Sequence, residues 1–531
     1  MKIDYDKIIE LLVKENPKDF SALSRFKRKM AKTLKIHTLT NVELLKHYHK
    51  SSVKKSLKLE LLLKKRPVRS LSGIVNVSVL TKPYACPGKC LYCPTQVNMP
   101  KSYLAGEPAA QRAQDLSFDP YKQTWQRLEV LEREGHNASK IDLRVIGGTW
   151  SYYPKKYRDW FVGQCFKACN DFKLDKKQTP GSNPNLAKEQ KKNELAKYRI
   201  IGISIETRPD YITQKEIIHL RELGVTKVEL GVQSIFDSVL NLNLREHKTE
   251  QTIKATQLLK DAGIKVSYQI MPNLYGSSLK KDLEMFDQLF SNPDYCPDYL
   301  KIYPLAVVKE APLYQLYKEK KFKTYSIKQM RDLLIKIKTS LPYYVRVERV
   351  IRDIPSTYIQ NPGAKVSNLR QLILEQMHKD GLKCNCIRCR EIKERFDAKE
   401  KLYLFREDYN ASNGKEIFLT FEDKERKHLH SLLRLRIPSQ VIEHKKHFLP
   451  VLQDSAIIRE VHTYGSQVPV GQKAKATQHK GLGKKLIKEA EKIVKKEFKL
   501  KNIAVISGIG VRDYYKKLGY KEKATYLTKT I

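Results

Sequence analysis

Residues 84–94 read YACPGKCLYCP and place Cys86, Cys90 and Cys93 within eight residues. They follow SGIVNVSVL, residues 72–80, a β-branched run that predicts a strand. Thiolates at spacings of four and three can each hold one iron of a 4Fe-4S cluster, which leaves the fourth iron open.

An open iron can be chelated by the amino and carboxylate groups of S-adenosylmethionine, which is the arrangement that radical chemistry needs. Tyr92, just before the last cysteine, would then lie against the adenine. A zinc site is the alternative. Zinc needs four ligands and no fourth stands close by, so a remote residue would have to complete the set.

The chain around this loop alternates strand-like runs with amphipathic helical stretches from about residue 76 to 370. Such alternation predicts parallel strands joined by right-handed crossover helices, in a full or partial (β/α) barrel with its catalytic end at the strand ends. The later runs are DLRVIGG (142–148), IIGISIE (200–206), KVELGVQ (227–233), IKVSYQIMP (264–272), LKIYPL (300–305) and YVRVERVI (344–351).

The remaining segments have other compositions. Residues 173–197 are polar and punctuated by Pro and Gly, so we expect a mobile loop there. Residues 371–400 hold a cysteine-rich linker, and residues 401–531 predict a second α/β domain with antiparallel strands, a long helix and the strand IAVISG. Residues 1–75 predict short amphipathic helices that end in SSVKKSLKLELLLKKRPVRS, with seven Lys or Arg and one acid.

The charge is strongly positive: Lys and Arg number 101 and Asp and Glu 58, a net +43. Such an excess favours a nucleic-acid partner, whereas a merely solvated basic surface is the alternative. The start MKIDYDKIIE has acids and no apolar core, and no run reaches eighteen apolar residues, so we expect a cytoplasmic protein without membrane spans. Nine cysteines in a reducing compartment favour metal sites over disulfides.

Candidate site residues stand at the predicted strand ends of the barrel. Paired glycines let backbone approach a ligand, and residues two apart in a strand share one face, so Lys301 and Tyr303 could together grip a carbonyl or phosphate. A strand-end turn for the glycines and a surface ion pair between Glu206 and Arg208 are the alternatives. The candidates are Gly147, Gly148, Thr149, Glu206, Arg208, Gln233, Lys301 and Tyr303.

The C-terminal region carries a second set of candidates. Gln478, Gly481 and Gly483 open a long helix whose free amides could bind a pyrophosphate, although a glycine-rich helix cap would look the same. Tyr514 and Tyr515 follow the strand IAVISG and are placed to meet a thioester, although packing alone would also explain them.

Two further cysteine groups differ in kind. Cys384, Cys386 and Cys389 suit zinc, with a second iron-sulfur cluster as the alternative. No fourth ligand is evident, and Cys296 and His378 are equal candidates. Cys165 and Cys169 lie four apart on an apolar helix face, and core packing explains them best.

The motifs in combination resemble one family. CPGKCLYCP, GGT, SIETRPD, LGVQSIFDSVL, LKIYPL, RDIPSTYI, SNLRQ, HTYGSQVPV, QHKGLGKKL and ISGIGVRDYYKKLGY resemble the catalytic subunit of the Elongator complex and its stand-alone archaeal and bacterial relatives. The likeness covers nearly all of the chain beyond residue 75. One departure is the compact interval CPGKC, which is much longer in many members.

The resemblance implies a radical S-adenosylmethionine barrel followed by a GCN5-related acetyltransferase domain. It implies formation of 5-carboxymethyluridine at the tRNA wobble position from acetyl-CoA. Lys301 and Tyr303 would handle acetyl-CoA or uracil, and His462, Tyr514 and Tyr515 the thioester, although His462 suits an ordinary strand histidine equally well. The basic residues that we expect to contact tRNA are Lys54, Lys55, Lys64, Lys65, Arg66 and Arg208.

Two rival functions remain open. A protein lysine acetyltransferase would need the C-terminal domain alone, with the iron-sulfur cluster structural. A noncatalytic tRNA-binding protein would consume no S-adenosylmethionine. Intact thiolates, glycines and tyrosines at both sites favour the enzyme.

Overall fold

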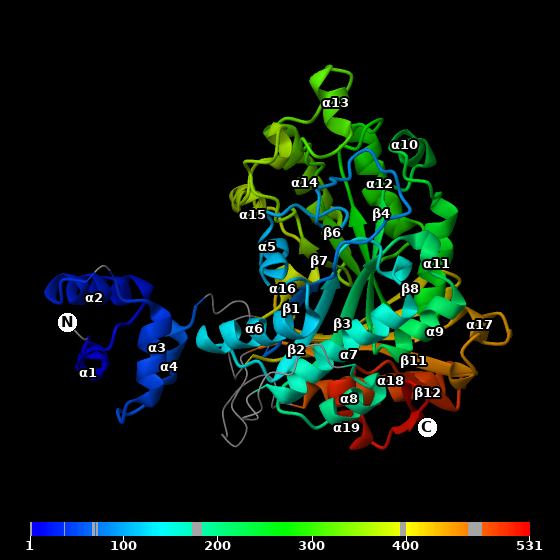
Figure 1. Cartoon of the computed structure of the whole chain (residues 1–531). Helices are drawn as coiled ribbons and strands as arrows, with labels where there is room; N and C mark the ends of the chain where they lie inside the picture. The colour runs from blue at the N-terminus through cyan, green and yellow to red at the C-terminus, as the bar shows by residue number, and fades with distance from the viewer. Residues whose placement is uncertain are drawn as a thin grey trace.

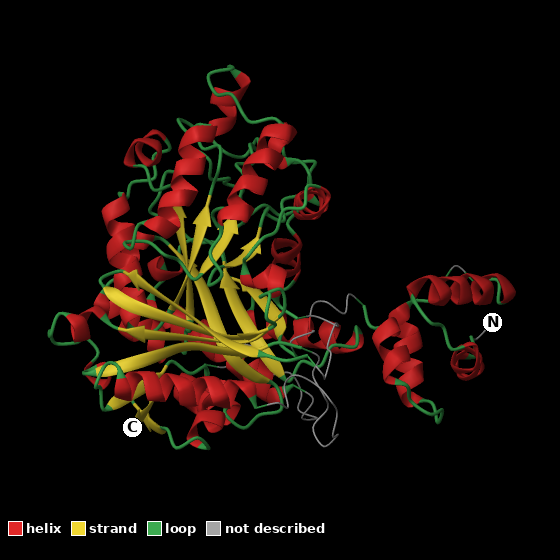
Figure 2. Ribbon diagram, turned by 180° about the vertical axis from the view of Figure 1, so that it is seen from behind, coloured by secondary structure: helices red, strands yellow, loops and turns green. Residues whose placement is uncertain are grey.

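The chain folds into three successive units, seen in a computed structural model that describes residues 3–36, 38–65, 70, 73–172, 183–392, 400–465 and 481–531. A small helical unit stands to one side, and a parallel sheet and a mixed sheet form the main body (Figures 1 and 2). No helix in the described part of the chain combines the length and the apolar character that crossing a membrane requires.

The N-terminal unit consists of short amphipathic helices, as the sequence predicts. They bury a core of their own that includes Leu12, Phe26 and Tyr48. Thr40 begins the third helix with a capping box that it shares with Glu43. The helices are α1 (Tyr5–Glu15), α2 (Phe20–Thr33), α3 (Asn41–Lys50) and α4 (Leu57–Leu63).

The middle unit is a seven-stranded parallel sheet in the order β1-β2-β3-β4-β5-β6-β7. All the predicted strands are present, and the first and last are not paired to each other in the described residues, so the sheet is an open half-barrel. The strands are β1 (Val75–Leu80), β2 (Lys140–Ile146), β3 (Arg199–Thr207), β4 (Lys227–Gln233), β5 (Lys265–Ile270), β6 (Tyr299–Ile302) and β7 (Arg346–Arg349).

Helices cover the outer face of the half-barrel (Figure 1). Their apolar sides pack on the strands in one core, in which Cys165 and Cys169 are fully buried, so the prediction of core cysteines is confirmed. The main covering helices are α5 (Pro108–Asp115), α6 (Pro120–Arg133), α7 (Lys155–Asp171), α9 (Gln214–Glu222), α11 (Thr249–Asp261), α12 (Leu279–Ser291), α14 (Ile327–Ser340) and α15 (Leu369–Lys379). Shorter helices are α10 (Asp237–Leu242), α13 (Leu313–Lys318) and α16 (Ile387–Arg390).

The prediction of a loop over residues 173–197 is wrong for its second half. The structure has a helix there, α8 (Leu186–Asn193), which packs beside α7. Asn193 is buried, accepts from the Ile200 amide at 2.8 Å and donates to the Asn170 side chain at 2.8 Å. Polar composition masked this helix because Leu186 is its one large apolar residue against the core, and side-chain amides hold its other end. Residues 173–182 lie outside the described part.

The C-terminal unit is a mixed seven-stranded sheet in the order β13-β14-β12-β11-β10-β9-β8. Strands β11 and β12 are parallel and pair only from Ser455 to Ile458, so β11 runs on to Thr463 without β12 beside it. The elements are β8 (Tyr403–Ala411), β9 (Gly414–Glu422), β10 (Leu429–Ile437), α17 (Ser439–Ile442), β11 (Ser455–Thr463), α18 (Leu482–Lys496), β12 (Asn502–Val505), α19 (Arg512–Lys516), β13 (Lys521–Lys523) and β14 (Tyr526–Thr530). The sequence missed β8, β13 and β14.

Buried ion pairs join the two sheets. The Asp298 carboxylate, just before β6, accepts from both terminal nitrogens of Arg459 on β11, at 3.0 and 2.6 Å. Lys260 of α11 lies 3.6 Å from Asp298 and 3.5 Å from Glu416 of β9. All four side chains are at most 1% exposed. Because removing any member would leave an uncompensated buried charge, this network fixes how the barrel sits on the C-terminal sheet.

Replacing Asp298 by Asn should therefore be costly. It leaves the charges of Arg459 and Lys260 without their shared carboxylate, so we expect a loss of about 3–5 kcal/mol in the free energy of unfolding. Denaturant unfolding followed by circular dichroism measures it. Asp332→Asn, at a half-exposed position beside Arg331, is the control and should change stability by less than about 1 kcal/mol. Equal losses in the two variants would contradict the role of the network.

Candidate active site

A cavity of about 1550 Å³ runs through the half-barrel. At the carboxyl ends of the strands it is lined by Tyr92 and Tyr103, and at the other end by His462 and Tyr514 of the C-terminal unit. The cysteine loop and the glycine-rich start of α18, 388 residues apart from Cys93 to Gly481, therefore face one continuous space.

The cysteine loop follows β1, as predicted, and lies beside the GGT segment that follows β2. The Cys86 sulfur is 3.7 Å from the Thr149 hydroxyl. Gly147 has φ +122°, and a Cβ there would collide with the Thr81 hydroxyl, so only glycine fits this turn. The structure thus brings the predicted residues 147–149 to the cysteines.

Two side chains that the sequence analysis missed complete the surroundings of the cysteines. Arg245 is buried and donates to the Cys90 sulfur at 3.5 Å and to the Gly231 carbonyl at 2.5 Å, and it has no carboxylate within ion-pair distance in the described residues. Among the described residues, neither ring nitrogen of buried His247 has a hydrogen-bond partner. A buried guanidinium without a carboxylate fits an anionic group held by the three thiolates.

The two cysteine groups differ in spacing. Among the described residues, Cys384, Cys386 and Cys389 form a group whose sulfurs all lie within 4.8 Å of one another, and the three loop cysteines form none. Thiolates on a single zinc ion lie about 3.8 Å apart, given bonds of about 2.3 Å. Three irons of a cluster hold their thiolates farther apart. The loop cysteines therefore suit a cluster, and Cys384, Cys386 and Cys389 suit one ion.

The predicted fourth ligands of the second group are wrong. The Cys296 sulfur contacts the backbone oxygens of Asn292 and Asn410, and His378 is exposed; neither belongs to the group. Instead the Lys338 ammonium lies 3.2 Å from the Cys384 sulfur and 3.7 Å from that of Cys389. A buried cation this close compensates thiolate charge.

Lys301 lies at the centre of a carboxylate network near the strand ends. Its ammonium donates to Glu229 and, at 3.4 Å, to Glu206. Burial opposes its charge, but Glu229, Tyr303 and Glu206 outweigh burial and raise the pKa of Lys301 above its usual value. Glu206 also accepts from the Tyr103 hydroxyl at 2.7 Å. Lys301 is thus a cation at any physiological pH.

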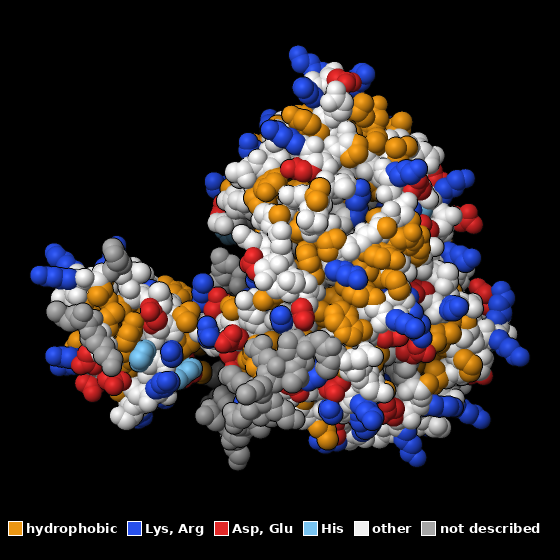
Figure 3. All heavy atoms as spheres, in the orientation of Figure 1, with side chains coloured by type: hydrophobic (Ala, Val, Ile, Leu, Met, Phe, Trp, Pro, Cys, Tyr) orange, Lys and Arg blue, Asp and Glu red, His pale blue; other side chains and the backbone are white. Residues whose placement is uncertain are grey.

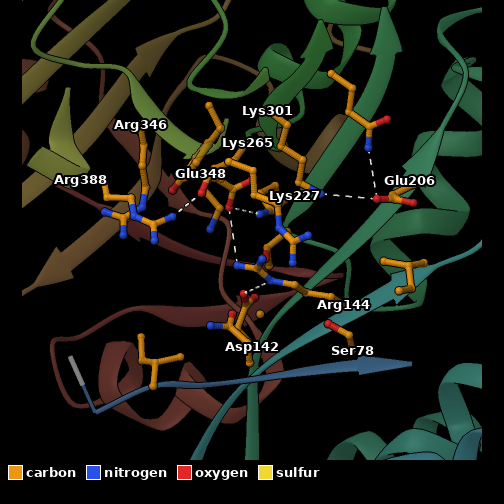
Figure 4. Close-up of a pocket in the computed structure, with 18 of the residues that line it drawn as sticks. Ser78, Asp142, Arg144, Glu206, Lys227, Lys265, Lys301, Arg346, Glu348 and Arg388 are labelled. Atoms are coloured by element: carbon orange, nitrogen blue, oxygen red, sulfur yellow. Dashed lines mark hydrogen bonds and ion pairs between the residues drawn. The ribbon is translucent and has the colours of Figure 1, made fainter. Parts of the chain in front are cut away.

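Further ion pairs line the cavity below Lys301, where barrels usually hold branched apolar side chains. Lys227 lies 2.8 Å from Glu348, and Arg144 lies 3.0 Å from Asp142 (Figure 4). These charges keep the interior of the half-barrel polar.

Gln233, at the end of β4, has a strained backbone, with φ +69° for a non-glycine residue. The residue is 9% exposed, and its side-chain oxygen Oε1 accepts no hydrogen bond from the described residues. Strain and an unsatisfied acceptor facing the cavity are typical of a ligand-binding position.

The far end of the cavity holds the predicted thioester residues. His462 stacks on Tyr464 with ring centres 4.2 Å apart, and burial lowers the pKa of His462 to about 4, so its imidazole is neutral. Gly483 faces this end, and a Cβ there would lie 3.5 Å from the Tyr514 hydroxyl. Gly481 caps α18 with φ +67°. Gln478 lies outside the described residues.

The residues predicted to contact nucleic acid have mixed surroundings. Lys54 is exposed, Lys55 donates to the Ser51 carbonyl at 2.7 Å, and Lys65 lies 3.2 Å from Glu134. Lys64 is partly buried, and Arg66 lies outside the described part.

The surroundings of Arg208 do not fit the expectation that it contacts tRNA. It is 4% exposed, pairs with Asp210 at 2.9 Å, and its terminal nitrogen sits where a Cβ on Gly88 would be. Its surroundings make it a support for the cysteine loop rather than an accessible contact for RNA.

Comparisons with known proteins agree with this geometry. Residues 80–289 match the radical SAM superfamily, and residues 297–379 match the radical SAM C-terminal domain. A tRNA uridine(34) acetyltransferase of Methanocaldococcus infernus is 44% identical over 485 residues, which are 88% of this chain and 88% of that protein. Elongator complex protein 3 of Danio rerio is 36% identical over 502 residues, 91% of this chain and 88% of that one. The chain belongs to this family of Elongator catalytic subunits and tRNA uridine(34) acetyltransferases.

A solved member of the family has the same fold. The archaeal Methanocaldococcus infernus Elp3 with an N-terminal deletion (1-46) is 41% identical, with a TM-score of 0.74, and covers 87% of this chain and 100% of that chain. The resemblance drawn from the sequence motifs is therefore confirmed, and the chain is of the stand-alone archaeal and bacterial type.

The second cysteine group gives a prediction about metal. Purified chain should carry about one zinc per molecule at Cys384, Cys386 and Cys389, because their sulfurs already converge on one point. Cys386→Ser should lose this zinc and lower the unfolding temperature by several degrees. Cys296→Ser is the matched control, since its sulfur lies elsewhere. Elemental analysis decides, and a full zinc content in Cys386→Ser would contradict the assignment.

Proposed function

We propose that this chain forms 5-carboxymethyluridine at the wobble position of tRNA from acetyl-CoA, using S-adenosylmethionine and a 4Fe-4S cluster. The observation that carries the proposal is the single cavity that connects the cysteine loop to the start of α18. Two reactive sites that face one continuous cavity can act on one substrate in sequence. Relatives from Methanocaldococcus infernus and Methanocaldococcus jannaschii that are named tRNA uridine(34) acetyltransferase support the same substrate.

Cys86, Cys90 and Cys93 would hold the cluster, with Arg245 offsetting its negative charge. The segment Gly147–Thr149, together with Glu206, Gln233 and Tyr92, would hold S-adenosylmethionine. When bound, the cluster and S-adenosylmethionine supply the radical chemistry that removes a hydrogen atom from the acetyl methyl group.

The C-terminal unit would act as a GCN5-related acetyltransferase-like domain that binds acetyl-CoA. The free amides at Gly481 and Gly483, at the start of a 15-residue helix, suit the pyrophosphate. The gap where β11 leaves β12 beyond Ile458 gives the pantetheine arm a path to Tyr514 and His462. The thioester would then enter the polar interior of the half-barrel.

Lys301 and Tyr303 would orient the uracil. The Lys301 ammonium is fixed by two carboxylates and can donate a hydrogen bond to a uracil carbonyl without changing its protonation state. We assign the helical region 1–75 to tRNA binding, residues 76–370 to the radical domain, 371–400 to the metal linker and 401–531 to the acetyl-CoA domain.

The alternative of a protein lysine acetyltransferase has less support. That reaction needs a base near the thioester, and Glu460 is the carboxylate closest in sequence to His462. Glu460 accepts from Arg434 at 2.9 Å and from the Tyr299 hydroxyl at 2.5 Å. Burial opposes its charge, but Lys265 and Arg434 lower the pKa of Glu460 to about 2, which makes it a poor base.

The cluster assignment predicts the effect of one cysteine. Cys90→Ala should lose nearly all iron from the anaerobically reconstituted chain and should release no 5′-deoxyadenosine, because two thiolates do not retain a cluster. Cys296→Ala, also buried, is the control and should keep both. Iron analysis and chromatography of the small-molecule products measure the outcome. Full iron and turnover in Cys90→Ala would overturn the assignment.

The acetyl-CoA assignment predicts the effect of one glycine. Gly483→Glu places a negative charge in the first turn of α18, against the expected pyrophosphate, so the affinity for acetyl-CoA should fall at least about tenfold while iron content stays normal. Lys488→Glu makes a charge-reversed control at an exposed position of the same helix. Calorimetric titration compares them. Unchanged affinity in Gly483→Glu would show that the glycines only cap the helix.

A further inference from the structure

Three arginines gather at the β7 side of the cavity, outside the site described so far. Arg346 comes from β7, Arg370 from α15 and Arg388 from α16, and all three line the cavity. Figure 4 shows the guanidinium groups of Arg346 and Arg388 side by side. Three separate elements thus bring like charges together.

The positive charges are only partly balanced. Arg346 donates to Glu391 at 2.7 Å and to the Tyr464 hydroxyl at 3.2 Å. Arg370 donates to the Val347 carbonyl at 3.2 Å, and Arg388 to the Glu348 carbonyl. Within the ranges that the structure describes, neither Arg370 nor Arg388 has a carboxylate at 4.0 Å or less. Backbone carbonyls orient these two guanidiniums without neutralising them.

The charge balance of Arg346, Arg370 and Arg388 differs from that of other buried arginines in this protein. Buried Arg434 and Arg459 each face carboxylates. By contrast, Arg370 and Arg388 donate to backbone carbonyls, so the like charges of Arg346, Arg370 and Arg388 repel one another. A bound anion would relieve this repulsion. The planar forks of guanidinium groups match the oxygens of a phosphate.

The position of these three arginines indicates which kind of molecule would supply the phosphate. The half-barrel is open between β1 and β7; α5 and α6 pack on the β1 side and α16 on the β7 side. The N-terminal helices lie beside α6, on this open side (Figure 1). On the visible face, Lys and Arg are spread widely rather than gathered in one patch (Figure 3), so exposed charge alone does not locate an RNA path. The three arginines in the cavity are a more specific feature, because their guanidinium groups converge on one place (Figure 4).

We propose that Arg346, Arg370 and Arg388 bind a backbone phosphate of the RNA whose uridine is modified. The inference rests on the proposed function and adds a binding site to it. Arg349, which pairs in register with Lys301, lies three residues along β7 from Arg346, about 10 Å. That is the scale of one nucleotide, so a phosphate held here leaves its base within reach of Lys301. The phosphates of acetyl-CoA have a separate candidate site at the start of α18.

The test uses the full chain and labelled tRNA. Arg370→Gln removes one unbalanced charge, and Arg370→Gln with Arg388→Gln removes two. Because the three arginines hold one phosphate, the double variant should flatten the plot of log affinity against log salt by about one unit and weaken binding at low salt by about tenfold, and the single variant should show part of both effects. Arg331→Gln, a half-exposed arginine of α14 paired with Asp332, is the matched control and should leave slope and affinity unchanged.

Iron, zinc and acetyl-CoA affinity are measured on every variant, because Arg388 stands between Cys386 and Cys389. Flatter slopes in the single and double variants with normal acetyl-CoA affinity support the proposal. Wild-type slopes in both variants overturn it. Reduced acetyl-CoA affinity with unchanged tRNA binding also overturns it, since the phosphate would then belong to the coenzyme. If the unchanged chain shows no salt-dependent tRNA binding, the proposed function itself fails and this inference fails with it.

Discussion

The buried ion network around Asp298 and Glu416 holds the rest of the structure in register. Ion pairs this deep cost desolvation free energy, and they persist because every charge has a partner. Their effect is geometric: the barrel and the C-terminal sheet meet at one fixed orientation, and the loop at Gly508 presses so closely on the Ile201 carbonyl that a Cβ has no room. Residues of both units line the continuous cavity, so its shape depends on that orientation.

The polar interior follows from this arrangement. A closed barrel would fill with branched apolar side chains. In this open half-barrel the interior instead carries ion pairs such as Lys227 with Glu348, in which opposite buried charges compensate each other. A polar lumen admits a thioester and a nucleotide, whereas a packed apolar core would exclude both. Lys301 stands where both substrates would meet.

Local pattern was enough to predict the strands of the half-barrel, the cysteine loop and the shared face of Lys301 and Tyr303, because each depends on residues close in sequence. Contacts between residues far apart in the sequence could not be predicted from local pattern. Lys338 lies 46 residues from Cys384, and Arg245 lies 155 residues from Cys90. Neither has a spacing that signals its role. The helix α8 was missed because only Leu186 supplies a large apolar contact with the core, while amide hydrogen bonds of Asn193 attach its other end.

The central claim is that both halves of the cavity act on one uridine, and isotope tracing tests it most directly. Anaerobic incubation of tRNA with the reconstituted chain, reductant, S-adenosylmethionine and acetyl-CoA carrying ¹³C at both acetyl carbons is followed by mass analysis of the nucleosides. The account predicts carboxymethyluridine with both labelled carbons, formed only when both cofactors are present. Labelled acetyl groups on protein lysines, with no labelled nucleoside, would contradict it.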